Sequence, residues 1–180
     1  VASTSGLEVV VPLAGEGLLP GALTMTPSGL TPCEDGTVDL GDIVIGESRA
    51  QAFAVSNGGA EPSGAITFAV SSGLTLVSGS AEGDCESGVT ALVDGQSCTV
   101  SVQLEPTERA PLSGSLTVTS ELVGSASLAL RARGISKGIL ELGADDVNFG
   151  RVVLGATAPG LLALRNGGDQ PLELPSIVVG

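Results

Sequence analysis

The sequence contains no histidine, no tryptophan and no tyrosine, and its only aromatic residues are Phe53, Phe68 and Phe149. Without histidine, the chain offers no Ser-His or Cys-His nucleophile pair and no imidazole ligand for a metal. Its 20 acidic and 7 basic residues give a net charge of −13, which repels phosphate backbones, and few aromatic rings remain to stack on bases. We therefore expect no enzyme, no cofactor, no metal and no nucleic-acid partner.

The chain also lacks a long uninterrupted apolar run. Its most apolar stretch, residues 7–25, contains Glu8, Glu16, Pro12 and Pro20, whereas a membrane span needs about 20 largely apolar residues in succession. Disorder is excluded as well, because 42% of the residues are hydrophobic and the mean hydropathy is +0.43. We expect the 180 residues to fold without membrane insertion, with the negative charge maintaining solubility.

Two offsets align the sequence with itself. A shift of 109 residues places 38–46 on 147–155 and 57–62 on 166–171, with matching glycines and aliphatic residues. A shift of 117 residues aligns 1–25 with 118–142 through six identities. Because the two offsets differ by eight, the first copy carries eight extra residues, and these lie within 26–37 around Cys33. The sequence is therefore a tandem array.

The register of the repeat predicts the domain organisation. Residues 21–135 form one complete unit, 1–20 match the C-terminal strand or strands of a preceding unit, and 136–180 match the N-terminal strands of a following unit. Counterparts of about 63–117 are missing from both partial copies, and a partial sandwich exposes half a core and an unpaired edge. We expect a window cut from a longer multidomain chain. The alternative is a subunit whose end strands complete a neighbouring chain.

Short alternating segments predict an all-β fold. In 97–104, apolar residues alternate with serine, threonine and glutamine, which is the period of a half-buried strand, and 7–13 alternates similarly. Turn residues such as Asp94-Gly95 separate the segments, and strands at this spacing in units of about 100 residues indicate immunoglobulin-like β-sandwiches. Further strands are expected at 23–25, 38–40, 50–56, 65–70, 74–77, 116–119 and 127–130.

Five motifs follow one another through the complete unit, at 38–46, 52–59, 95–106, 114–120 and 130–134. In this order they resemble the signature of hydin-type (ASH) immunoglobulin-like domains, and the closest variant is the bacterial choice-of-anchor D type. The resemblance implies a sandwich of about seven strands, repeated along large and often secreted or surface-bound proteins, with no catalytic residues. Leu104 stands where the family usually has phenylalanine, and the insertion around Cys33 is a second departure.

The cysteines bear on the cellular compartment. Cys85 and Cys98 have twelve residues between them, with the Asp94-Gly95 turn in the interval, so that they can lie on facing segments. We predict a disulfide, because the chain otherwise looks extracytoplasmic; two buried thiols are the alternative. Cys33 is then unpaired or pairs outside this window. Three cysteines at these spacings give no zinc pattern.

Acidic residues gather in expected loops, namely Glu34 and Asp35, then Glu82, Asp84 and Glu86, then Asp145 and Asp146. Calcium takes six to eight converging oxygens, and the sequence has no motif that supplies them. Solvated loop charge is therefore the favoured interpretation, and calcium binding at domain junctions is the alternative.

Three functions remain open. The favoured one is a non-catalytic structural repeat of a large secreted or cell-surface protein, as a stalk, spacer or fibre element that contacts neighbouring immunoglobulin-like units of the same or adjacent chains. A filament assembled by strand donation is a version of it. The second is an adhesive module that binds a protein or glycan through a sheet edge or the loops 26–37 and 78–88. The third is an intracellular scaffold, as eukaryotic hydin-type relatives suggest.

Overall fold

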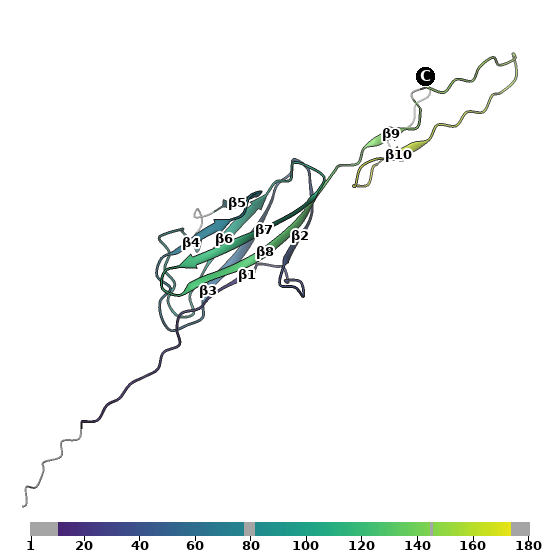
Figure 1. Cartoon of the computed structure of the whole chain (residues 1–180). Helices are drawn as coiled ribbons and strands as arrows, with labels where there is room; N and C mark the ends of the chain where they lie inside the picture. The colour runs from purple at the N-terminus through teal and green to yellow at the C-terminus, as the bar shows by residue number, and fades with distance from the viewer. Residues whose placement is uncertain (1–10, 78–81, 145, 174–180) are drawn as a thin grey trace, which may run out of the picture.

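In a computed structural model of the chain, residues 11–77, 82–144 and 146–173 are described. They contain ten β-strands and no helix, which confirms the expected all-β class. None of these residues belongs to a helix long and apolar enough to cross a bilayer. Strands β1 to β8 gather in one body, whereas β9 and β10 form a hairpin beyond the end of β8 (Figure 1).

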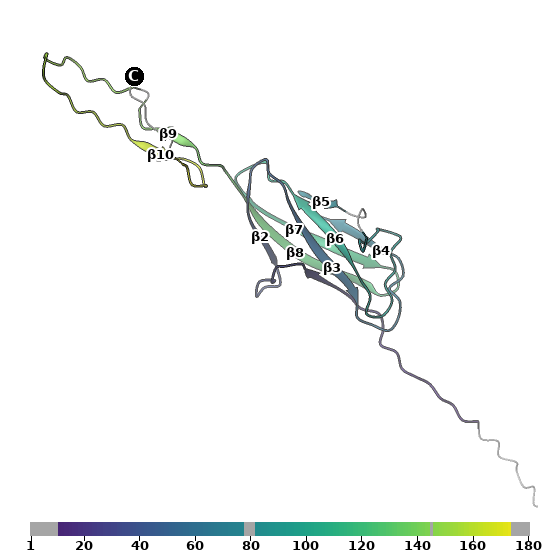
Figure 2. The same ribbon diagram turned by 180° about the vertical axis from the view of Figure 1, so that it is seen from behind.

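The body consists of two four-stranded sheets. The first is antiparallel throughout, in the order β1 (Leu23–Pro27), β3 (Arg49–Asn57), β6 (Ser97–Leu104) and β5 (Leu74–Val77). The second has the order β2 (Val38–Val44), β8 (Gly124–Ile135), β7 (Pro111–Ser120) and β4 (Ile66–Val70), and its β2 runs parallel to β8. Figure 2 shows the same arrangement from behind.

Alternating residues of both sheets form one hydrophobic core. Along β6 every second side chain is buried, from Cys98 to Leu104, as the alternation predicts. These side chains share a cluster with Phe53 of β3 and with Leu116 and Leu130 of the second sheet. Burial of each such side chain stabilises the fold by about 1.5–3 kcal/mol. Aliphatic residues therefore provide most of the core's stability, because the chain has few aromatic residues.

Every strand expected within 21–135 is present, although β7 and β8 extend to 10 and 12 residues and the body has eight strands rather than about seven. The expected strand over 7–13 differs. Its first four residues lie outside the described residues, and Val11 and Leu13 are exposed and belong to no strand. The reason is that a strand takes its hydrogen bonds from a neighbour, and no described strand runs beside these two residues.

The remaining hairpin joins β9 (Leu140–Leu142) to β10 (Leu164–Asn166), antiparallel, with Leu140 opposite Asn166 and Leu142 opposite Leu164. In the body, β1 and β3 pair in the equivalent register, with Leu23 opposite Asn57. The sequence repeat therefore has a structural counterpart in the start of each copy.

Candidate functional site: the junction of the two copies

Each copy begins with a short connector, residues 20–22 in the first copy and 137–139 in the second, and one buried asparagine fixes the first of these. Asn57 Oδ1 accepts hydrogen bonds from the backbone N–H groups of Ala22 (3.0 Å) and Gly59 (3.2 Å). Its Nδ2 donates to the backbone oxygen of Glu61 (2.8 Å). One amide side chain thus ties the incoming chain to the turn that follows β3, using both its acceptor and its donors.

The second copy repeats this arrangement at Asn166. Its Oδ1 accepts from the N–H groups of Ile139 (3.1 Å) and Gly168 (2.9 Å), and its Nδ2 donates to the backbone oxygen of Gln170 (2.8 Å). Each partner lies at the position that the sequence repeat assigns to it. The two connectors therefore join their copies in the same way.

Close backbone contact fixes the two connectors further. A Cβ atom on Gly59 would lie 2.0 Å from the backbone oxygen of Pro20, and one on Gly168 would lie 1.9 Å from that of Lys137. Neither distance is possible for real atoms, so both positions require glycine. The close approach of each connector thus explains why the two copies share glycine at this position.

A bend in the backbone near the middle of β2 is also repeated in the second copy. Asp39 Oδ1 accepts from the N–H of Gly41 (2.8 Å), and Asn148 Oδ1 accepts from the N–H of Gly150 (2.8 Å). Gly41 and Gly150 have φ angles of +72° and +64°, in the left-handed region that favours glycine. The two copies therefore share their local backbone in this region also.

One carboxylate links the body to the second copy. Asp169 Oδ2 accepts from the backbone N–H (3.0 Å) and the hydroxyl (3.2 Å) of Ser136, which directly follows β8. Its Oδ1 pairs with the guanidinium of Arg109 and lies 4.0 Å from Arg133 Nη2. The equivalent position in the first copy is Ala60, which has no carboxylate. The first copy therefore cannot form the same contact.

The junction is electrostatically distinct from the rest of the chain. The hydrogen bond from the Ser136 N–H, followed by that from Arg109, lowers the pKa of Asp169 below its usual value, so the carboxylate is ionised at neutral pH. Lys137 Nζ lies 3.4 Å from Glu47 Oε1, an exposed pair that adds little by itself. Three of the chain's seven basic residues therefore gather at the junction, although the net charge is −13.

The insertion in the first copy is tied to β8 by a single arginine. Arg131 Nε lies 3.0 Å from Asp39 Oδ2, and its guanidinium reaches Asp35 (3.8 Å) and Cys33 Sγ (3.4 Å). Backbone hydrogen bonds from Gly41 to Asp39 and from Thr37 to Asp35 are the largest causes of the lowered pKa of each carboxyl. Cys33 is half-buried and is a free cysteine.

Cys85 and Cys98 are joined by a disulfide, with an S–S distance of 2.03 Å and a Cα–Cα distance of 5.2 Å. The Cys85 N–H donates to Thr99 O (2.7 Å) and the Thr99 N–H to Gly83 O (2.9 Å), so this segment lies beside β6. Residues 78–81 of the expected binding loop lie outside the described residues.

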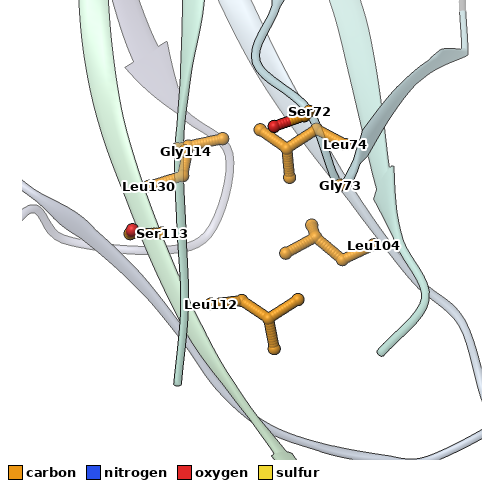
Figure 3. Close-up of a pocket in the computed structure, with 8 residues that line it drawn as sticks. All are labelled: Ser72, Gly73, Leu74, Leu104, Leu112, Ser113, Gly114 and Leu130. Atoms are coloured by element: carbon orange, nitrogen blue, oxygen red, sulfur yellow. The ribbon is translucent and has the colours of Figure 1, made fainter. Parts of the chain in front are cut away.

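One small cavity lies between the two sheets. The cavity in Figure 3 lies between Leu74 and Leu104 of one sheet and Leu112 and Leu130 of the other. Its volume is about 20 Å³, room for a single water molecule. This cavity therefore cannot serve as a substrate site.

The acidic loops were the candidate positions for calcium. Among residues 11–77, 82–144 and 146–173, no three histidine, cysteine, aspartate or glutamate side chains converge where a metal could be held. The Asp35 carboxylate is engaged by Thr37 and Arg131, and Asp145 lies outside the described residues. Calcium binding thus gains no support from these residues.

Sequence reasoning did not find the Asp169 junction. Its partners Arg109 and Ser136 lie 60 and 33 residues away in the chain, so no local pattern connects them. The only signal is the replacement of Ala60 by aspartate in the second copy, and an alanine-to-aspartate change on a surface turn is uninformative without its neighbours.

No protein-family model and no curated protein matches the chain. Among solved structures, the secreted serine protease VesC from Vibrio cholerae is similar with a TM-score of 0.40 and 21% identity, over 54% of this chain and 21% of that one. The VesB protease of Vibrio cholerae gives 0.38 and 18%, over 62% and 31%. The ASH/PapD-like domain 7 of human CEP192 gives 0.40 and 14%, over 76% and 99%. The chain thus spans less than a third of either protease, and at these TM-scores the likenesses assign no function.

Proposed function

We propose that the chain is a non-catalytic structural element, made of consecutive immunoglobulin-like β-sandwich units of the hydin-type (ASH), choice-of-anchor D kind, in a large secreted or cell-surface protein. In this proposal 21–135 is a complete unit, 1–20 the end of a preceding unit and 136–180 the start of a following one. The supporting observation is the repeated connector, in which Asn57 and Asn166 hold equivalent groups with equivalent hydrogen bonds.

A spacer has to hold its units in a fixed direction, and two features of the junction support this role. Strand β8 ends at Ile135 and β9 begins at Leu140, so only residues 136–139 connect the two strands. Asp169 then fastens the second copy to Ser136, which directly follows β8, and to Arg109 of the body. A short connector with a charged fastening restricts the relative motion that separate domains otherwise have.

The disulfide supports the proposed compartment. A bond between Cys85 and Cys98 forms and persists in an oxidising environment, which is the environment of secreted and surface proteins. The same bond argues against an intracellular scaffold, where thiols are kept reduced.

The test measures whether the second copy tumbles with the body. Amide ¹⁵N relaxation of the chain at low concentration should give the β9–β10 hairpin the same rotational correlation time as β1–β8. Replacing Asp169 by alanine should shorten the correlation time of the hairpin and leave that of the body unchanged, because the carboxylate is the fastening.

A matched control removes an ion pair of the same kind inside the second copy. Glu141 Oε2 lies 3.5 Å from Arg165 Nε and contributes nothing to the junction, so Glu141→Ala should leave the hairpin's correlation time unchanged. Independent tumbling of the hairpin in the unsubstituted protein would contradict the spacer function.

A further inference from the structure

Two of the chain's three asparagines directly precede glycine, in Asn57-Gly58 and Asn166-Gly167. Asparagine is a thermally labile residue. Its side-chain amide is attacked most readily by the backbone nitrogen of a following glycine, because glycine has no Cβ atom to obstruct the approach. These two asparagines are also the ones that bind the connectors. The residues that fix the connectors are therefore the chain's candidates for deamidation.

In both copies the folded connector binds the nitrogen that would attack. The Gly58 N–H donates to the backbone oxygen of Ala22 (2.9 Å), and the Gly167 N–H donates to that of Ile139 (2.8 Å). A peptide nitrogen becomes nucleophilic when it loses its proton, and a proton held by a carbonyl oxygen is not released. Each reaction therefore has to wait until its connector moves away.

The chain that enters the first copy also holds the turn that follows β3. The Ala60 N–H donates to the backbone oxygen of Leu19 (3.1 Å), and Asn57 Oδ1 accepts from the N–H of Ala22 (3.0 Å). Opening of the connector frees the attacking nitrogen and Oδ1 together. It also loosens the turn that carries Glu61 O, the acceptor of Asn57 Nδ2 (2.8 Å). The side-chain amide can then rotate toward the next nitrogen.

We propose that Asn57 and Asn166 are deamidation sites, and that each is modified only when its connector has opened. The proposal goes beyond the structural function, because it concerns a covalent change in the connectors themselves. It assigns the chain a modification that proceeds in water without an enzyme and that occurs once per opened connector.

The reaction is the same in both copies and is described here for the first. In the opened state, hydroxide removes the proton of the Gly58 nitrogen, and this nitrogen forms a bond to Cγ of Asn57. The bond from Cγ to Nδ2 breaks, and Nδ2 takes a proton from water and leaves as ammonia. A second water molecule then opens the succinimide ring at either carbonyl, which gives aspartate or isoaspartate. The sum is one water consumed and one ammonia released, with no oxidant or reductant.

The product cannot restore the connector of the first copy. Asn57 is fully buried, and its Nδ2 donates to Glu61 O (2.8 Å) and Leu92 O (3.1 Å). An ionised carboxylate has only acceptors, so it would place a charge against two carbonyl oxygens without a donor between them. Isoaspartate also adds a methylene group to the backbone at the end of β3. Opening of the connector thereby becomes irreversible.

The first test compares two rates that depend on the same N–H group in the full chain. Hydrogen exchange at Gly58 and deamidation at Asn57 both need this N–H to be released, so opening should limit both reactions. Relative to a short peptide with the sequence of residues 54–61, folding should slow the two reactions by factors that agree within about ten-fold. Exchange is followed by nuclear magnetic resonance, and deamidation by peptide mass spectrometry in the same mildly alkaline buffer.

Either disagreement would overturn the proposal. Deamidation that is slowed far more than exchange would show that opening of the connector is not sufficient. Deamidation that is slowed far less than exchange would show that the connector does not control it.

The second test opens one connector at a time. In Gly59→Ala and in Gly168→Ala, the new Cβ would overlap a backbone oxygen of the connector of the same copy. Gly59→Ala should raise the deamidation rate at Asn57 by at least about ten-fold and leave that at Asn166 unchanged, and Gly168→Ala should do the reverse. Each variant is thus the matched control for the other. An equal change at both asparagines, or none at either, would contradict control by the connectors.

A third variant separates the chemistry from a loss of fold. A Cβ on Gly58 would meet no atom within 4 Å, and Gly58 does not have a positive φ, so Gly58→Ala is compatible with the fold. Its methyl group obstructs the attack. Added to Gly59→Ala, it should return deamidation at Asn57 toward the original rate while the connector stays open to hydrogen exchange. Fast loss of ammonia in the double variant would exclude attack by the nitrogen of position 58.

Far-UV circular dichroism shows whether Gly59→Ala keeps the body folded. If it does not, the comparison of the two rates in the unsubstituted protein decides the proposal. The spacer function is measured separately, by the tumbling of the β9–β10 hairpin, so that each proposal can fail while the other stands.

Discussion

Asp169 Oδ2 lies 3.0 Å from the backbone nitrogen of Ser136, so a turn of the second copy is held by the residue that directly follows the last strand of the body. The contact places a negative charge where Arg109 and Arg133 converge. It adds a charged contact to a short connection, and the strength of this contact depends on the ionisation of one carboxyl group.

The junction should therefore loosen in acid. The pKa of Asp169 is lowered from the value of about 3.9 in unfolded chains. A lowered folded-state pKa means that the contribution is fully present above the unfolded value and is lost as the pH falls through the folded value. Relaxation of the hairpin should thus match the body at pH 7 and pH 5 and separate from it below about pH 4.

Asp169→Asn provides the control for this pH dependence. The amide has nearly the same shape but does not titrate, so hairpin relaxation should be the same at pH 7 and below pH 4 in this variant. A pH dependence that persists in the variant would assign the effect to another carboxyl group.

Replacing Asn57 by alanine should destabilise the body. Asn57 is fully buried and bonds to four backbone groups, two through Oδ1 and two through Nδ2, including Leu92 O at 3.1 Å. Leaving several of these groups unpaired should cost about 2–4 kcal/mol in the free energy of unfolding. Urea denaturation followed by far-UV circular dichroism measures the change.

The equivalent substitution in the second copy tests whether the loss of stability depends on the burial of the asparagine. Asn166 is exposed, so Asn166→Ala should change the unfolding free energy of the body by less than about 0.5 kcal/mol. It should raise hydrogen exchange at Ile139, which loses its acceptor. Similar losses of stability in the two variants would show that the copies do not differ in burial.

Removing the disulfide should lower the free energy of unfolding of the body. The bond closes a loop with a sequence separation of 13, for which the chain-entropy model gives about 3 kcal/mol. Cys85→Ser combined with Cys98→Ser should therefore lower the unfolding free energy by roughly that amount, measured by chemical denaturation. Cys33→Ser should leave it unchanged, because Cys33 forms no disulfide.

A methyl group at Gly168 should displace the connector. The new Cβ would overlap the backbone oxygen of Lys137, so Gly168→Ala should increase hydrogen exchange over 137–142 without changing the unfolding of the body. Gly167→Ala is the matched control, since the three atoms nearest to its Cβ all belong to the exposed Glu141 side chain, which can move. Equal exchange in the two variants would contradict the close contact at Gly168.

Much of the body could be predicted from the sequence. Alternation over 97–104 placed β6 and its buried face, because a strand with one side against a core needs apolar residues at every second position. The turn at Asp94-Gly95 was predicted too, and Gly95 has a φ of +69° there. Such features depend on neighbours in the sequence, and sequence patterns report them well.

The contacts of the candidate site could not be predicted from the sequence, because they join distant parts of the chain. Arg131 reaches Asp39 across 92 residues, and Arg109 reaches Asp169 across 60. The sequence contains these charges but not their pairing. With 20 acidic residues available to 7 basic ones, many pairings are compatible with the composition.

The segments 38–44 and 147–153 separate what the sequence determines from what the tertiary structure determines. Their shared glycines and aliphatic residues determine the same local bend, with Gly41 and Gly150 in the same left-handed conformation. Only the first is a strand, because only there does β8 lie alongside and supply hydrogen bonds. The sequence alone determined the bend and the apolar pattern, which are local. The tertiary structure decided that 38–44 is a strand, because a β-strand is completed by its neighbour.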